Sequence, residues 1–203
     1  PNIKQYNYNI DQAGELLTAA GWLSVEGKTF RQKKDQELKI VITTVNRGEN
    51  PAVAEVIQKT WQNLGVKTEL KLIDSGTIKN DIIKPRNFEV LLFSEITGYD
   101  PDPYPFWHSS QAGPAGLNLS NFINKDADKL LVEARSTAEP QVRHDRYVAF
   151  QDILSRELPA IFIYAPKYIY PLAKHIQGLD TVNITNSFDI CFPYLGIFCK
   201  YRF

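Results

Sequence analysis

The chain has 203 residues, and its 23 lysines and arginines balance 23 aspartates and glutamates, so the formal net charge is zero. This balance disfavours the basic surface that nucleic-acid-binding proteins need. The longest apolar run, residues 160–165, is far shorter than the roughly 20 residues of a membrane-spanning helix. The sequence begins at Pro1 and contains no methionine, so we expect a processed product or a piece of a longer protein.

The first third of the chain predicts a helix and then a strand–helix–strand unit. Asp11 is a suitable N-cap for the first helix, and Gly21 is suited to end it. A polar hairpin or loop is expected over residues 28–37. Residues 38–44 and 66–73 alternate in polarity as strands do. Their separation by one helix predicts a parallel βαβ unit.

The helix between these strands shows clear start and stop signals. Asn50 is suited to cap it, Pro51 to occupy its first turn, and Gly65 to end it. Apolar spacing predicts that its inner face consists of Val53, Val56, Ile57, Thr60, Trp61 and Leu64.

The remaining elements complete an α/β pattern. We expect a short helix over 75–83, a strand buried on both faces over 88–93, and a long functional loop over 98–116. Two helices follow, and another buried strand is expected over 160–164. The helices are marked by Ala127, Leu130, Leu131 and Ala134, and then by Pro140, Tyr147, Phe150 and Leu154. The fold class expected is therefore α/β, with a mixed or parallel sheet and an apolar C-terminal tail.

Histidines and cysteines give no metal-site spacing, so no metal or cofactor is expected. His144 and His175 are interpreted as surface residues. A hairpin around residues 194–196 would place Cys191 opposite Cys199, which permits a disulfide in an oxidising compartment. The alternative is an extended tail with two free, buried thiols.

The segment DPDPYPFWHSSQ, residues 100–111, is the richest in chemistry-bearing side chains. Its prolines fix φ and favour extended geometry in the residues before them. Acidic and aromatic groups in a rigid loop suit recognition of a cationic or amphipathic small ligand. Two alternatives remain: the loop caps the sheet edge, or Asp100 and Asp102 form an acid/base pair of a hydrolase. Nothing else in the sequence supplies a nucleophile for that second alternative.

Five segments, in order, resemble the C-terminal lobe of the extracellular solute-binding proteins of the dipeptide/oligopeptide class, which are receptors of ABC importers. The resemblance covers roughly residues 6–178. The segments are YNYNIDQAGELLTAAGW, ENPAVAEVIQKTWQNLGVKTEL, FEVLLFSEITGYDPDPYPFWHSSQ, GLNLSNFINKDADKLLVEARST and RHDRYVAFQDILSRELPAIFIYAPKYIY.

This resemblance implies a lobe of the type II periplasmic-binding-protein fold, formed by residues 1–177. Residues 178–203 would be a tail that crosses to a first lobe that this chain lacks. The family closes two lobes around a solute and delivers it to a membrane permease, without chemistry. A peptide is the first choice of ligand, with sugar, nickel and haem as alternatives. The location implied is periplasmic or extracellular, tethered to a bacterial membrane.

The resemblance also suggests site residues. An acidic residue shortly before the acid–proline pair holds the ligand's ammonium group in peptide receptors of the family, but that position here is Tyr99. We therefore expect Asp100 to serve as the ammonium partner, with Tyr99 and Trp107 as apolar walls. The expected set is completed by Asn118 as a hydrogen-bonding group, together with Asp102 and His108.

A sensor or chaperone on the same lobe is a further alternative to uptake. The isolated lobe is expected to bind peptide only weakly, and to fold its tail back or self-associate through it.

Overall fold

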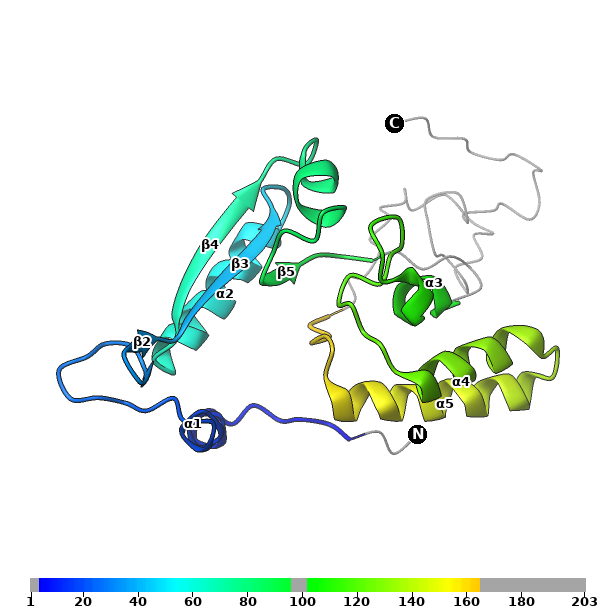
Figure 1. Cartoon of the computed structure of the whole chain (residues 1–203), viewed down its shortest axis with the longest axis horizontal. Coiled ribbons are helices and arrows are strands. Elements are labelled where there is room, and N and C mark those ends of the chain that lie inside the picture. Colours follow the sequence, from blue (N-terminus) through cyan, green and yellow to red (C-terminus); the bar gives the residue numbers. More distant parts are fainter. Residues whose placement is uncertain (1–3, 96–101, 165–203) are drawn as a thin grey trace, which may run out of the picture.

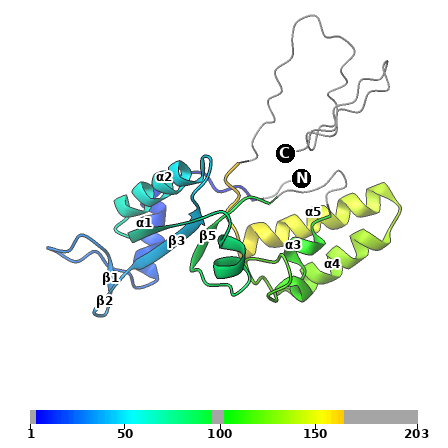
Figure 2. The ribbon, with the colours of Figure 1, turned by 90° about the horizontal axis from the view of Figure 1, so that it is seen from above.

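The computed structural model describes residues 4–95 and 102–164. It has an α/β part, with a parallel sheet flanked by helices, and a helical part beside it (Figure 1). Seen from above, the sheet with α1 and α2 again lies to one side of α3, α4 and α5 (Figure 2). The α/β class expected from the sequence is confirmed.

The sheet has the strand order β4-β3-β5, formed by Lys67–Ile73, Lys39–Val45 and Val90–Leu92. Both pairings are parallel, and Ile42 lies opposite Leu70 on one side and Val90 on the other. Helix α2 (Asn50–Asn63) packs against β3 and β4, so the predicted βαβ unit is confirmed. The residues of β5 are only partly buried, whereas the sequence predicted burial on both faces.

Helix α1 (Ile10–Ala19) precedes a short hairpin of β1 (Gln32–Lys33) and β2 (Gln36–Glu37). Its N-cap is Asn9 rather than the predicted Asp11. The Asn9 backbone is extended, and its side chain accepts a hydrogen bond from the Gln12 amide at 2.9 Å. Asp11 therefore lies inside the first turn. Gly21 has a φ of +88°, as expected for the residue that ends this helix.

The start and inner face of α2 differ from the prediction in two details. Glu49 occupies the cap position without a capping hydrogen bond from its side chain, and Asn50 is the first helical residue. Ala54 is fully buried, whereas Val56 is 64% exposed. The small Ala54 methyl lets the helix approach the sheet closely, and this rotates Val56 away from it. Gly65, with φ of +80°, ends the helix as predicted.

A π-helical turn (Lys79–Ile83) lies between β4 and β5 in the chain. The helical part consists of α3 (Tyr104–Trp107), a 3-10 turn (Ser109–Gln111), α4 (Lys125–Ser136) and α5 (Pro140–Glu157). Helices α4 and α5 pack against each other, as both views show (Figures 1 and 2). Their apolar faces and Phe122 form the core, onto which Trp107 packs. The buried core residues are Phe122, Ala127, Leu131, Phe150, Ile153 and Leu154.

Residues 160–164 do not form the buried strand that their apolar run predicted. The segment lacks a ladder partner among the residues described, and Ile161 and Phe162 are 75% and 73% exposed. A run of apolar residues becomes a strand only when a neighbouring strand supplies backbone hydrogen bonds. His175, Cys191, Cys199 and the tail from residue 178 lie outside the described residues. Among the helices described, none is long and apolar enough to cross a membrane.

Candidate ligand-binding site

The parallel sheet has a switch point between β3 and β5. From β3 the chain moves to β4 on one side, and then crosses to β5 on the other side. In open parallel sheets, ligands bind beyond the carboxyl ends of strands at such a point. The loop that the sequence singled out follows β5 in the chain, and its described part begins at Asp102. The Thr44 hydroxyl donates to the Leu92 carbonyl at 2.8 Å, which joins the ends of the two strands.

Asp102, at the start of this loop, is engaged on both carboxylate oxygens. One oxygen accepts a hydrogen bond from the Tyr104 amide at 3.0 Å, and the other lies 2.9 Å from Nε of Arg135 on α4. The Arg135 guanidinium also lies over the Tyr104 ring, 4.3 Å from its centroid. These contacts anchor the first described residues of the loop to the last turn of α4.

The extended geometry predicted for the residues before the prolines is wrong for Tyr104, which precedes Pro105 and lies in α3. Pro103 has φ of −76° and ψ of −9°, and it opens the short helix α3. Proline fits the start of a helix because its missing N–H would have no intrahelical partner there. Tyr104 and His108 then fall one turn apart, and their rings stack with centroids separated by 4.2 Å.

The far end of α3 is held by a second residue of α4. Asp128 accepts hydrogen bonds from both the amide and the hydroxyl of Ser109, the first at 2.8 Å. Nε2 of His108 lies 3.9 Å from Asp128. Nδ1 of His108 accepts from the Ser110 amide at 3.1 Å, so the ring caps the 3-10 turn. His108 is therefore partly engaged within the chain.

Trp107 turns toward the helical core. Its ring makes edge contacts with Phe122 and Phe150, both at a centroid distance of 6.4 Å, and it lies 5.9 Å from Phe162. It remains partly exposed beside the loop. The geometry is compatible with the apolar wall predicted for Trp107 and shows in addition that the residue anchors α3 in the core.

Asn118 is fully buried, with 0% exposure. Its amide nitrogen lies within hydrogen-bond distance of the carbonyls of Trp107, His108 and Phe122. Its amide oxygen accepts from the Ser120 hydroxyl and the Phe122 amide. These contacts give Asn118 a structural role at the end of α3, and a ligand contact by this residue stays a prediction.

Arg86 is a loop-supporting residue that the sequence reasoning missed. Its guanidinium donates to the carbonyls of Gly113, Gly116 and Asn118 at 3.1, 3.0 and 3.3 Å. It adopts a positive φ of 56° after the π-helical turn, which aims the side chain back at the loop. No short motif signals this role, because the partners lie about 30 residues later.

Of the remaining predicted site residues, Tyr99 and Asp100 lie outside the described residues. Glu95 lies before them on the same segment after β5. Loss of solvent around its carboxyl raises the pKa of Glu95 to about 7, although part of the side chain stays exposed. Its titration therefore falls near neutral pH.

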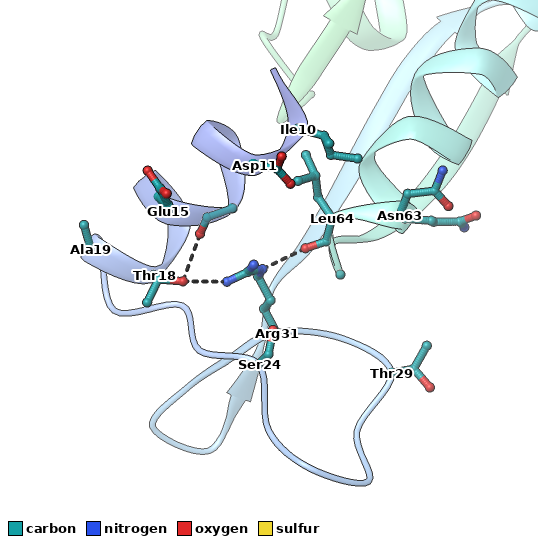
Figure 3. A pocket seen from close by; sticks show the side chains of 13 residues that line it. Ile10, Asp11, Glu15, Thr18, Ala19, Ser24, Thr29, Arg31, Asn63 and Leu64 are labelled. Atoms are coloured by element: carbon teal, nitrogen blue, oxygen red, sulfur yellow. Dashed lines mark hydrogen bonds between the residues drawn. The ribbon is translucent and has the colours of Figure 1, made fainter. Parts of the chain in front are cut away.

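A separate open cavity of about 950 Å³ lies between α1, the segment that joins α1 to β1, and the end of α2 (Figure 3). Arg31 crosses it: Nε donates to the Leu64 carbonyl at 2.7 Å, and Nη1 donates to Thr18 at 3.0 Å. Leu64 and Gly65 precede β4, so this cavity is at the amino end of the sheet. That edge is opposite the one where parallel sheets bind ligands. Through these contacts Arg31 connects α1 to the end of α2, which indicates a structural role.

Among the residues described, no group of three or more His, Cys, Asp or Glu side chains is placed to hold a metal ion.

Residues 1–116 match the model of the bacterial extracellular solute-binding proteins, family 5 Middle. The chain belongs to this family. The family resemblance stated from the sequence is thereby confirmed.

Individual relatives of this solute-binding protein chain agree with the assignment. It is 23% identical over 180 residues to the oligopeptide-binding protein AppA of Bacillus subtilis, covering 87% of the chain and 33% of AppA. It is 25% identical over 183 residues to a dipeptide-binding protein of Escherichia coli, covering 87% of the chain and 32% of the relative. The chain therefore spans about a third of the length of the curated relatives it matches.

Solved structures show the same fold. AppA in complex with a nonapeptide matches with a TM-score of 0.70 at 22% identity, covering 78% of this solute-binding protein chain and 32% of AppA. NikZ of Campylobacter jejuni in complex with Ni(L-His) matches with a TM-score of 0.66 at 24% identity, covering 78% and 32%. The periplasmic-binding-protein-like fold expected from the sequence is confirmed.

Proposed function

We propose that this chain is one lobe of a receptor that binds peptides between two lobes and delivers them to the permease of an ABC importer. The receptor needs no chemistry for this task. Closure of the lobes around the ligand presents a closed shape to the membrane partner. Residues 1–177 form the lobe, and residues 178–203 form a tail that crosses to the other lobe.

The observation that carries this proposal is the switch point in the parallel sheet, together with an acidic and aromatic loop that follows β5 in the chain. Within the described part of the loop, α3 is anchored on the core by Trp107. Such a loop offers aromatic faces for apolar side chains and acidic groups for an ammonium. A peptide has both features, which makes it our first choice over sugar, nickel and haem.

Within this proposal, Asp100 pairs with the ammonium of the peptide, and Tyr99 and Trp107 form the apolar walls. Asn118 as a hydrogen-bonding group and His108 complete the site. The contacts of Asp102 to Arg135 and to the Tyr104 amide support a role in shaping the loop. The same contacts weigh against the hydrolase alternative, which needs Asp102 as a free acid or base. Measuring turnover of peptide and glycoside panels by the full-length receptor tests that alternative.

Location and partners follow from the family. We place the full-length receptor outside the cytoplasm, tethered to a bacterial membrane, with the permease as its partner. In the isolated lobe, the apolar tail from residue 182 onward is expected either to fold back or to pair between copies. Light scattering tests this last point, and a strictly monomeric chain with a protease-sensitive tail would contradict it.

Calorimetry with defined peptides tests the central proposal. The full-length receptor should bind one or more peptides of two to nine residues with a micromolar or lower dissociation constant. The isolated lobe should bind them no tighter than about millimolar, worth about −4 kcal/mol, because half of the ligand's buried surface is missing. Micromolar binding by the isolated lobe would contradict the two-lobed site.

A further inference from the structure

Two residues on one side of α4 hold the two ends of α3. Arg135 contacts Asp102 and the Tyr104 ring before α3, and Asp128 contacts Ser109 after it. The two α4 residues are seven positions apart, which is two helical turns and about 10 Å along the axis. This spacing matches a one-turn helix with a residue or two on either side.

Helix α4 is itself a fixed support. Asn124 caps it by accepting hydrogen bonds from the amides of Asp126 and Ala127, both at 3.0 Å. Ala127, Leu131 and Ala134 are fully buried against the core. Asp128 and Arg135 each follow one of the buried alanines in sequence, so they share a neighbouring face of the helix. Their side chains therefore extend from a backbone that has little freedom to move.

We propose that Arg135 and Asp128 are positioning residues that preset the ligand loop without touching the ligand. This inference rests on the proposed function, because it assumes that the loop binds the solute. The guanidinium suits the task since it lies over the Tyr104 ring while Nε pairs with Asp102, a combination that a lysine ammonium does not provide. Presetting a loop strengthens binding because less freedom is lost when the ligand arrives.

The pairing also assigns a role to Asp102 within the acidic loop. Its carboxylate charge is offset by Arg135, and one of its oxygens caps the Tyr104 amide. The residue thus serves as the loop's fixed point on α4.

Ligand affinity of the full-length receptor gives the first test, with random-sequence peptides of two to nine residues as the probe. For the peptide that the unmodified receptor binds best, Arg135→Ala and Asp128→Ala should each weaken binding about three- to tenfold. Arg135→Lys should lose nearly as much as Arg135→Ala. The control is Lys129→Ala, on the same helix with a 75% exposed side chain, which should stay within about twofold. Arg135→Ala within twofold of the unmodified receptor would overturn the proposal.

A double-mutant cycle separates positioning from general destabilisation. If Asp102 and Arg135 act as one contact, the double variant Asp102→Ala/Arg135→Ala should bind no more weakly than the weaker single variant. Losses of affinity that simply add would overturn the claim that the two residues act together. The melting temperatures of all variants are recorded beside the affinities.

Amide hydrogen exchange of the ligand-free receptor gives a readout that does not depend on the ligand. Arg135→Ala should speed exchange in residues 104–111, whereas Lys129→Ala should leave it unchanged. Unchanged exchange in Arg135→Ala would overturn the proposal that Arg135 holds the loop in place. If the unmodified receptor binds none of the peptides, the proposed function fails, and exchange alone decides whether α4 holds the loop.

Discussion

Asn118 and Phe122 exchange two hydrogen bonds across a tight turn. The Asn118 amide nitrogen donates to the Phe122 carbonyl at 2.8 Å, and the Phe122 amide donates to the Asn118 oxygen at 3.1 Å. The Phe122 ring then contacts Trp107 and belongs to the core between α4 and α5. One buried asparagine therefore links the end of the loop at the sheet's carboxyl edge to the core beneath it.

Asn118→Ala should lower the free energy of unfolding by about 2–4 kcal/mol, because several buried backbone groups lose their partner at once. Asn118→Asp should also destabilise, since a carboxylate oxygen would then face the carbonyls of Trp107 and Phe122. The matched control is Ser120→Ala, which removes one hydrogen bond to the same side chain. Chemical unfolding of the full-length receptor measures both. If Asn118→Ala is no worse than Ser120→Ala, the structural role is wrong.

Leu131→Ala should destabilise the helical part by about 2–5 kcal/mol, because it opens a cavity in a fully buried site. Its neighbour Val132 is 48% exposed, so Val132→Ala should cost well under about 1 kcal/mol. Thermal unfolding of the full-length receptor compares the two variants. Equal losses of stability would contradict the assigned orientation of α4.

Local patterns were sufficient to predict most of the elements. Alternation over residues 38–44 and 66–73 predicted β3 and β4. Gly21 marked the end of α1, and Gly65 marked the end of α2. The errors arose where tertiary packing decides between similar local choices. Val56 fits the helical spacing as well as Ala54 does, but close packing on the sheet selects the smaller side chain.

Gly65→Ala should destabilise the chain more than Gly27→Ala. Both glycines have positive φ, +80° and +76°, so both substitutions carry the same left-handed backbone strain. A Cβ at Gly65 would also lie 3.0 Å from Cγ of Arg31, whereas a Cβ at Gly27 meets nothing within 4 Å. The additional loss of stability in Gly65→Ala would come from displacing Arg31, which connects α1 to the end of α2. Comparing the two midpoints of unfolding checks this, and equal shifts would contradict the close contact.

The Glu95 carboxyl should titrate near pH 7 in the full-length receptor. Because its folded pKa is raised above the ordinary value near 4.5, protonation favours the folded state. Relative to Glu95→Gln, the receptor with Glu95 should therefore gain stability as the pH falls from above 7 toward 4.5, and change no further below that. Carbon NMR of the labelled carboxyl measures the pKa directly. A midpoint near 4.5 would contradict desolvation at this position.

The candidate site was only partly visible in the sequence. Its richest segment is local, and the pattern of acid, proline and aromatic residues singled out the loop that follows β5 in the chain. Ligand binding by this loop stays a prediction. The partner of Asp102 is Arg135, which follows 33 residues later among ordinary helix residues, and no local rule connects the two. Arg86 escaped notice for the same reason, since its acceptors are backbone carbonyls of a distant loop.

Photo-crosslinking is the most direct measurement of where the ligand lies. A peptide that binds the full-length receptor is rebuilt with a photoreactive phenylalanine analogue, irradiated in the complex, and mapped by mass spectrometry. We predict adducts on residues 93–108, the segment that follows β5 in the chain, and excess unlabelled peptide should abolish them. Competed adducts confined to the cavity between α1 and α2, at the opposite edge of the sheet, would contradict it.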